Sequence, residues 1–396
     1  MTTTNAAATS VLTAPAQVAD LLESAGLTGR GGALFSTATK LRAAIQSKAD
    51  LVVNACDGEI GAAKDGWIVT HHLDELLAGA QTLRPHRRAR IIVAAHRGSR
   101  TAGLLHAAGV DVLEVPHRYV SSEESALVQL LHGGPAKPMT KTRPFVHGGR
   151  DSRGRRIRPT LVLNAETVWR AQQILARGAE GPAWFRSHGT TQEPGPRLVT
   201  VTGHVARPGV AEAAAGIPLR DLLDLAGGAL PGARHVLVGG LGGVLLTTGE
   251  THTGVWSREG MAPFGGRLPD GTVVPGSMGA GVVTVLDPAR CPVDALGEYI
   301  AYGAGESAGQ CGPCMFGLPS IAQDWALLSR TPDPAVLQRL RGRLGLVRGR
   351  GACHHPDGVA RLAASALSAL EPHLLDHLSR AAAGRPACPT ARSSHV

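Results

Sequence analysis

The sequence predicts an α/β domain, then a small α+β module and finally a helical bundle. Three observations predict this order. Strand-like apolar runs alternate with helical stretches over residues 20–178, a Gly/Pro-rich break follows near 178–196, and apolar residues recur at helical spacing beyond residue 288. At 396 residues the chain is too long for one ordinary core, so two or three domains are expected.

The first domain, residues 20–178, has the alternation that is typical of a sheet covered by helices. Residues 51–53 and 91–94 are apolar runs of the kind found in strands. Residues 73–83 and 123–131 instead have apolar side chains at the three-to-four spacing of helices. This order of strands and helices predicts an α/β fold.

The second and third parts differ in periodicity. Residues 196–287 contain strand-like runs at 198–202 and 282–286 and a short helix at 219–225, which predicts a compact α+β module. Residues 288–380 have almost continuous helical spacing, which predicts a small helical bundle.

Both ends of the chain are rich in small and polar residues. Residues 1–19 and 381–396 are therefore expected to be flexible, and the tail would take Cys388 with it. The start lacks the pattern of a signal peptide, and no apolar run approaches the length of a membrane span. We expect a cytoplasmic protein.

The net charge of +9 raises the question of nucleic-acid binding. The basic residues are spread along the chain without a recognisable nucleic-acid-binding motif, so no nucleic-acid partner is expected. The densest group lies at 150–158. It is either a solvated loop or a docking patch for an acidic electron-transfer partner.

The six cysteines suggest metal chemistry rather than disulfides. Cys311 and Cys314 form a C-x2-C pair, and Cys353 follows in a Gly/His-rich segment. This spacing is typical of a metal or iron–sulfur site.

The most informative segment is the glycine-rich string GRGGALFSTATK at 29–40. Clustered glycines let backbone N–H groups approach a phosphate, and a following helix N-terminus adds a favourable dipole. The string lacks a glycine at Leu34 and follows helix-like residues 18–25 instead of a strand. It is therefore not a Rossmann loop.

This string and five later blocks resemble, in order, the flavoprotein subunit of respiratory complex I and of NAD-linked hydrogenases. The family's loop reads GRGGAGFPTGxKW. The later blocks are NACDGEIG (54–61) for the family's NADESEPG, YVSSEESAL (119–127) for YICGEETAL, RPTLVLNAET (158–167) for KPTTINNVET, GHVARPG (203–209) for the GxVxxPG turn of the SLBB module, and ESAGQCGPC (306–314) for ESCGxCTPC. The resemblance spans nearly the whole chain.

The resemblance implies an α/β FMN-binding domain, a ubiquitin-like SLBB module and an α-helical iron–sulfur bundle. It also implies a set of residues around FMN: Gly29, Arg30, Gly31, Gly32, Lys40, Asn54, Asp57, Glu123, Glu124 and Asn164. Phe35 and Phe145 would sandwich the adenine of NADH, Glu59 would hold a ribose hydroxyl, and Glu124 would also meet the nicotinamide carboxamide. Glu123 and Glu124 can also be read as the acidic first turn of a helix.

The chain departs from the family pattern at several positions near these cofactors. They are Ala43, Cys56, Asp57, Ser121, Ser122, Thr142 and Leu163. The side chain of Ser122, where the family has glycine, is expected to narrow the space near the cofactor. The choice between NADH and NADPH stays open.

The cluster motif is incomplete. Cys311, Cys314 and Cys353 match three of the family's four ligands, but the first ligand is replaced by Ala308, which cannot coordinate. The alternatives are a [4Fe-4S] cluster with Ser307, His354, water or a thiol on the fourth iron, a three-iron cluster, a zinc ion with His354, or a site without metal.

The resemblance implies an NADH-oxidising enzyme that passes electrons from NADH through FMN to an iron–sulfur cluster. The next carrier would be a ferredoxin-like or other iron–sulfur partner, in a complex that can be peripheral to a membrane. No residue needs to act as a general acid or base, because hydride passes directly to flavin. The alternative is a cofactor-depleted, non-catalytic relay or assembly subunit, which the departures at Cys56, Ser122, Leu163 and Ala308 favour.

Overall fold

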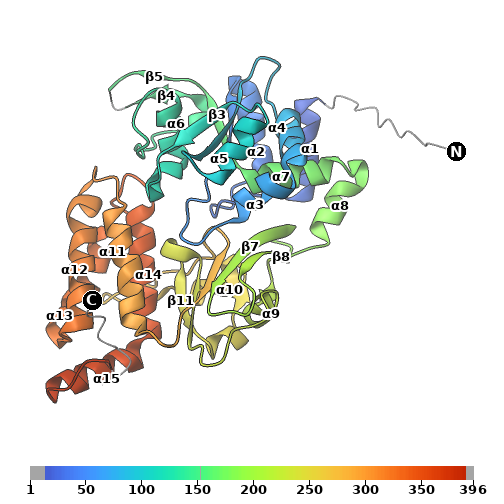
Figure 1. The fold of residues 1–396 in the computed structure, drawn as a ribbon. Coiled ribbons are helices and arrows are strands. Elements are labelled where there is room, and N and C mark those ends of the chain that lie inside the picture. Colours follow the sequence, from blue (N-terminus) through green and yellow to red (C-terminus); the bar gives the residue numbers. More distant parts are fainter. Residues whose placement is uncertain (1–13, 152, 389–396) are drawn as a thin grey trace.

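The computed structural model describes residues 14–151 and 153–388. They form an α/β unit, a mixed β unit and a helical unit, in the order expected from the sequence (Figure 1). Among the helices that the structure describes, none is both long and apolar enough to cross a membrane.

The first unit is built on a four-stranded parallel sheet with the order β3-β2-β1-β6. Its strands are β1 (Asp50–Asn54), β2 (Ile91–His96), β3 (Val112–Val115) and β6 (Thr160–Asn164). The chain moves from β1 to β2 and β3 on one side, and β6 lies on the other side of β1. The strand order therefore reverses between β1 and β6, which is where open α/β sheets bind ligands.

Within the described residues, the α-helices of this unit are α1 (Pro15–Ala25), α2 (Thr37–Ser47), α3 (Lys64–His71), α4 (Leu73–Thr82), α5 (Arg100–Ala107), α6 (Glu124–Leu131), α7 (Ala165–Leu175) and α8 (Gly181–Arg186). The unit is longer than the range 20–178 at both ends. Helix α1 begins at Pro15, because its buried face (Val18, Leu22) packs on α2 and α8. Helix α8 joins the unit through the buried Phe185.

The basic segment 150–158 forms a short exposed hairpin between β4 (Gly149–Arg150) and β5 (Arg156–Ile157). Asp151 fixes its turn by accepting hydrogen bonds from the backbone N–H groups of Arg153 and Arg155. The same carboxylate pairs with the Arg155 guanidinium at 2.6 Å. Part of the basic charge is thus neutralised inside the hairpin.

The second unit is a mixed sheet with the order β11-β10-β13-β7-β8, in which only β13 and β7 are parallel. Its elements are β7 (Pro196–Gly203), β8 (Gly209–Ala214), β9 (Ile217–Pro218), α9 (Leu219–Asp224), β10 (His235–Val238), β11 (Val244–Thr247), β12 (Val255–Trp256), α10 (Arg258–Met261) and β13 (Val282–Val285). Helix α9 buries Leu219, Leu222 and Leu223 against the core of this sheet.

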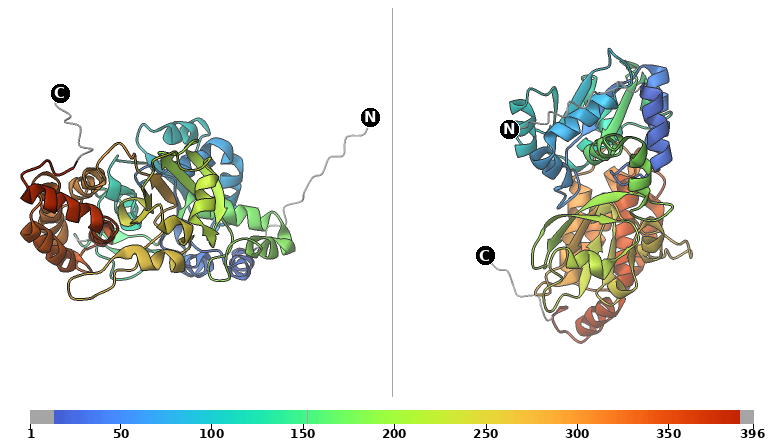
Figure 2. Two further views of the ribbon diagram at one scale, coloured as in Figure 1. Left: turned by 90° about the horizontal axis from the view of Figure 1, so that it is seen from below. Right: turned by 90° about the vertical axis from the view of Figure 1, so that its right-hand side faces the viewer.

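The third unit contains helices α11 (Pro292–Gly305), α12 (Leu318–Arg330), α13 (Pro334–Val347), α14 (His355–Ala369) and α15 (Glu371–Ala382). A single π-helical turn, Pro313–Gly317, precedes α12. Helix α14 packs against β11, and the Ser365 hydroxyl accepts a hydrogen bond from the Leu245 backbone N–H. The bundle thus lies directly against the second unit (Figure 2).

The two ends differ from the flexible segments expected from composition. At the C-terminus, α15 continues to Ala382 and Cys388 is buried against the bundle, because its side chain lies beside His373. Residues 1–13 and 389–396, which belong to the expected flexible ends, lie outside the described residues.

Candidate functional site

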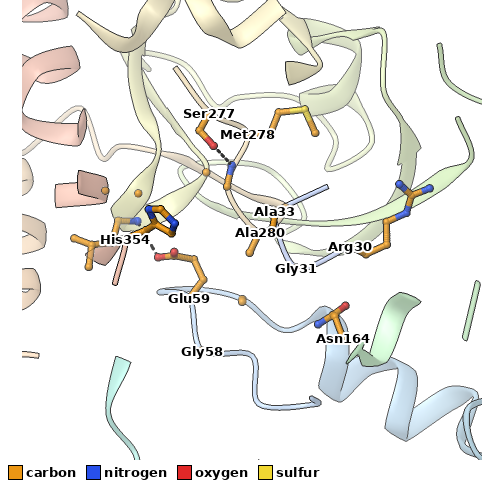
Figure 3. A pocket seen from close by; sticks show the side chains of 18 of the residues that line it. Arg30, Gly31, Ala33, Gly58, Glu59, Asn164, Ser277, Met278, Ala280 and His354 are labelled. Carbon is orange, nitrogen blue, oxygen red and sulfur yellow. Dashed lines mark hydrogen bonds between the residues drawn. The ribbon is translucent and has the colours of Figure 1, made fainter. Parts of the chain in front are cut away.

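A cavity of about 770 Å³ lies where the three units meet. The first unit contributes the glycine-rich loop and the ends of β1 and β6, the second contributes residues 239–242 and 275–281, and the third contributes residues 353–361 (Figure 3). A volume of this size is typical of ligand and cofactor sites. Many charged groups line it: Arg30, Asp57, Glu59, Lys64, Asp65, Glu123, Glu166, Arg197, Arg258 and Arg361.

Asn54 and Asn164 are the last residues of the adjacent strands β1 and β6 and are register partners. The Asn54 amide donates to the Ser122 carbonyl at 2.9 Å and accepts from the Cys56 N–H at 3.2 Å, which leaves one N–H and one lone pair for a ligand. Asn164 is different. Its oxygen accepts from Lys64 and the Glu166 N–H, and its nitrogen donates to Asp65.

A buried charge network fixes the side chain of Asn164. Lys64, at the start of α3, lies 2.9 Å from Asp65 and 3.2 Å from Glu166, and all three side chains are almost fully buried. Burial alone would lower the pKa of Lys64, but Asp65 and Glu166 outweigh burial and raise the pKa of Lys64. The lysine is therefore held as a cation and keeps the Asn164 amide in one orientation.

Asp57 follows β1 and has a positive φ of 47°, a backbone conformation that is uncommon for residues other than glycine. Its carboxylate accepts from the Asp65 N–H at 2.9 Å and the Gly66 N–H at 2.6 Å. Burial and the nearby charge of Asp65 raise the pKa of Asp57 to about 7. Burial also raises the pKa of the neighbouring Cys56 thiol, so that side chain stays neutral.

The glycine-rich loop offers backbone donors to the cavity. The Arg30 N–H is taken by the Thr167 hydroxyl, and the Gly29 N–H by the Phe35 carbonyl. Within the described residues, the N–H groups of Gly31, Gly32 and Ala33 have no hydrogen-bond partner in the protein. Such a row of free N–H groups beside Arg30 and Lys64 suits the phosphate of FMN.

The loop is also packed tightly against the second unit. Gly32 has φ +97°, and a Cβ there would lie 3.1 Å from the Gly279 carbonyl oxygen. The close approach of 277–280 to Gly31 and Ala33 is visible in Figure 3. Both conditions require glycine at position 32, because a side chain would strain the backbone and push the two units apart.

Glu59, the expected ribose ligand, links the first unit to the second. Its carboxylate accepts from the Tyr119 hydroxyl at 2.7 Å and from the backbone N–H groups of Leu241 and Ile60 at 2.8 and 2.9 Å. Burial raises the pKa of Glu59, although these three donors act in the opposite direction. Glu59 lines the cavity and points toward the third unit (Figure 3).

The two neighbouring glutamates, Glu123 and Glu124, have different partners. Glu123 is the N-cap of α6 and accepts from the N–H groups of Ser125 and Ala126, and burial raises the pKa of Glu123. Glu124 lies 3.0 Å from Lys40 and also contacts Lys141. Glu123 lines the main cavity, whereas Lys40 and Glu124 are not among its lining residues.

Phe35 and Phe145 lie in different environments. Phe35 is 53% exposed and is not among the residues that line either of the two described cavities. Phe145 is buried and lines a second cavity of about 880 Å³ together with Gln310, Cys311 and Ala352. The structure therefore does not bring the two rings to a common cavity, and the adenine sandwich stays a prediction.

Ser122 and Gly58 both line the cavity and lie side by side. A Cβ on Gly58 would lie only 2.0 Å from the Ser122 oxygen. In the family pattern the position of Gly58 is serine and the position of Ser122 is glycine. The two residues are thus exchanged in this chain, and the Ser122 side chain fills the space that a side chain at position 58 would take.

The three motif cysteines lie near one another in the helical unit. Burial raises the pKa of the Cys314 thiol to about 12, and the charges of Cys311 and Cys353 add to this shift. Burial likewise raises the pKa of Cys353 to about 11, while the His355 N–H acts in the opposite direction. Thiolates in such a place need a nearby cation, and the irons of a cluster supply one.

Comparison with known proteins agrees with this geometry. Residues 22–173 match the profile of the Nuo51 FMN-binding domain, residues 198–243 that of the SLBB domain, and residues 294–377 that of the NADH-ubiquinone oxidoreductase-F iron-sulfur binding region. The second F-type subunit of the NADH-quinone oxidoreductase of Rhizobium meliloti is 31% identical over 92% of this chain and 89% of its own length. The chain belongs to the family of F-type subunits of NADH-quinone oxidoreductase.

Two further proteins support this assignment. The F-type subunit of the Mycobacterium tuberculosis NADH-quinone oxidoreductase is 29% identical over 92% of this chain and 85% of that protein. The crystal structure of an NAD+-reducing [NiFe]-hydrogenase superposes with a TM-score of 0.77 at 27% identity, and the match covers 91% of this chain. The chain spans 62% of the length of that hydrogenase chain. The predicted fold class, and the FMN and iron–sulfur cofactors expected from the resemblance, are confirmed by these matches.

Within this family the replaced ligand at Ala308 is the main departure in the bundle. The two candidate substitutes differ in position. The Ser307 hydroxyl hydrogen-bonds the Cys314 thiol and thereby lowers its pKa, against the effect of burial. The His354 side chain is fully exposed and lies 3.5 Å from Asp357. Ser307 is thus already in contact with the motif cysteines.

The site also contains residues to which the sequence analysis assigned no role, although Lys64, Asp65 and Tyr119 belong to family-like blocks. They are Lys64, Asp65, Tyr119, Arg197, Leu241, Arg258 and the loop Ser277–Gly281. The glycines in this loop and directly before it were the available signal. Gly276 and Gly279 have no room for a Cβ, which would lie 1.9 Å from the Met261 carbonyl oxygen and 2.1 Å from the Gly239 carbonyl oxygen.

Proposed function

We propose that the chain is an NADH-oxidising flavoprotein subunit whose electrons leave through an iron–sulfur cluster to a partner protein. One observation carries the proposal. The same cavity is lined by the glycine-rich loop, by the strand-end asparagine Asn54, and by the cluster cysteine Cys353. Two-electron and one-electron carriers would therefore be neighbours in a single cavity. FMN, when bound, supplies the step from hydride transfer to single-electron transfer.

The residues of the chain would position and enclose these groups. The free N–H groups of Gly31, Gly32 and Ala33 would bind the FMN phosphate, and Asn54 would offer its remaining donor and acceptor to the ring. Asn164 is a positioning residue, because Lys64 and Asp65 already occupy its amide. Glu59 would accept a hydrogen bond from a ribose hydroxyl while it holds the second unit in place.

The test is a spectrum of the full chain, purified without oxygen, before and after NADH is added. We expect flavin absorbance that NADH bleaches, and less bleaching by NADPH. Asn54→Leu should lower the bound flavin per chain, whereas the matched surface change Gln81→Leu, on the exposed face of α4, should not.

Two results would contradict the proposal. Folded protein that is colourless and does not take up added FMN would be the cofactor-depleted subunit suggested by the departures. Flavin that NADH does not reduce, even though ferricyanide reoxidises it after dithionite, would show that the chain does not oxidise NADH.

A further inference from the structure

Four potential metal ligands converge in the helical unit, away from the motif cysteines. The residues are Cys291, His373, His377 and Cys388. Each offers one ligand atom, and these four atoms all lie within 4.8 Å of one another. Three of them are buried and His373 is partly buried. We propose that these four residues bind a structural Zn²⁺ ion.

The distances suit a single tetrahedral ion. The Cys291 sulfur lies 3.6 Å from the His373 Nε2 and 3.9 Å from the His377 Nε2. The Cys388 sulfur lies 3.9 Å from the His373 Nε2. With Zn–S bonds of about 2.3 Å and Zn–N bonds of about 2.0–2.1 Å, a tetrahedron places sulfur and nitrogen about 3.5 Å apart. A shift of a few tenths of an ångström would close the site around the ion.

The ligands come from three places in the chain. Cys291 is the N-cap of α11, where the helix dipole favours a thiolate. His373 and His377 are four residues apart on α15, so both rings lie on one face of that helix, with their centroids 4.4 Å apart. Cys388 follows α15 and returns to the same point.

The types of the four ligand atoms indicate which metal ion binds and whether that ion is structural or catalytic. Two sulfur and two imidazole ligands are typical of structural zinc, and carboxylate-binding cations such as Mg²⁺ are disfavoured. With all four positions taken by the protein, no open position remains for a substrate. The ion would therefore be structural.

Helix α15 shows what such an ion would stabilise. Of its twelve residues only Leu374 and His377 are buried, and Leu375 is 58% exposed. Two buried side chains supply little apolar packing for a helix of this length. In Figure 1, α15 lies at the edge of the helical unit. A zinc ion would connect α15 to the start of α11 through Cys291, and to the segment after α15 through Cys388.

This site is separate from the proposed cluster. Cys291 precedes α11 and Cys311 follows it, and a fourteen-residue helix is about 20 Å long. The inference therefore does not depend on the proposed function. It also predicts that zinc and iron in this chain respond to different substitutions.

The experiment measures zinc and iron per chain in the full-length protein, with any affinity tag removed. We expect about one zinc, which is lost in Cys291→Ser and in His377→Ala while iron is kept. Cys314→Ser is the matched control: it should lose iron and keep zinc. Zinc that is kept in both site variants, or that is lost in Cys314→Ser but kept in Cys291→Ser, would overturn the proposal.

A second measurement uses the unaltered chain and does not depend on whether a variant folds. After chelation, Co²⁺ should give the visible bands of a tetrahedral thiolate site, and the segment after Leu370 should become more sensitive to protease until Zn²⁺ is returned. A chain without zinc that binds neither Zn²⁺ nor Co²⁺ when its thiols are reduced would show that the four residues form only a thiol–imidazole cluster.

Discussion

The flavin cavity and the helical unit hold their functional groups in opposite ways. In the cavity, Asn54 and Asn164 end adjacent strands, and a buried network of Lys64, Asp65 and Glu166 connects them to α3 and α7. In the helical unit, Cys291 and Cys388 instead share His373 as a partner, and these contacts stay within that unit. A substitution in the cavity should therefore spread to its neighbours, whereas one in the helical unit should change only its own metal site.

The largest effect is expected from Lys64→Met. It leaves the buried Asp65 carboxylate without its cation and removes one of the cations beside Glu166, which keeps Arg170 at 3.7 Å. This should cost about 3–5 kcal/mol of unfolding free energy. Denaturant unfolding of flavin-free protein measures this. Arg90→Met, which removes an exposed pair with Asp111, should cost less than about 1 kcal/mol. Equal costs for the two variants would contradict the idea of a connected cavity.

Ala308→Cys tests the helical unit and should act only locally. It restores a thiol three residues before Cys311, so the cluster should no longer convert to a three-iron form on mild oxidation. Paramagnetic resonance of anaerobic protein checks the conversion, and the unfolding midpoint and flavin content should not change. In the control Ser307→Ala, the conversion should persist. If Ala308→Cys altered flavin content, the two regions would not be independent.

A smaller effect is expected from the exchanged pair Gly58 and Ser122. Gly58→Ser alone would place a side chain against the Ser122 oxygen and should cost about 1–3 kcal/mol. Adding Ser122→Gly should recover most of this loss, with a coupling energy of about 0.5–3 kcal/mol. Unfolding of the four proteins of the cycle gives that energy. Additive costs would mean that the two side chains do not share one space.

The last expected effect concerns pH. The pKa of Asp57 is raised to about 7, so the folded chain binds a proton more tightly than the unfolded chain. The stability from this group is present below the unfolded pKa of about 4 and is lost as the pH rises toward about 7. Glu59 and Glu123 are shifted in the same direction. Unfolding midpoints of flavin-free protein should fall over this range, and Asp57→Asn should flatten the curve.

The motifs lie where such roles are possible, but the roles of their residues toward the cofactors stay predictions. Residues 30–33 of the run GRGGA line the cavity, and the C-x2-C pair lies in the helical unit. The boundaries at Pro15 and Arg186 were less well predicted, because α1 and α8 are held by packing on each other and not by their own composition.

Groups that depend on distant parts of the chain could not be predicted. Cys291 and His373 are 82 positions apart, and nothing in their local sequence indicates that they meet. The role of Lys64 was missed for the same reason, because Glu166 is brought to it by the pairing of β1 with β6. The expected narrowing by Ser122 stays a prediction: Ser122 lines the cavity, and its side chain lies where a side chain on Gly58 would be.

The exchange at 58 and 122 also restricts how such sequences can change. A lineage that moves from serine–glycine to glycine–serine by single substitutions must pass through one of two intermediates. Serine at both positions would place an oxygen 2.0 Å from a Cβ, whereas glycine at both positions leaves only a small gap. The glycine–glycine intermediate is therefore the less destabilised of the two, because water or a slight shift of the loop can fill the gap. The two substitutions should therefore occur in a fixed order: serine is replaced by glycine at position 58 first, and glycine is replaced by serine at position 122 second.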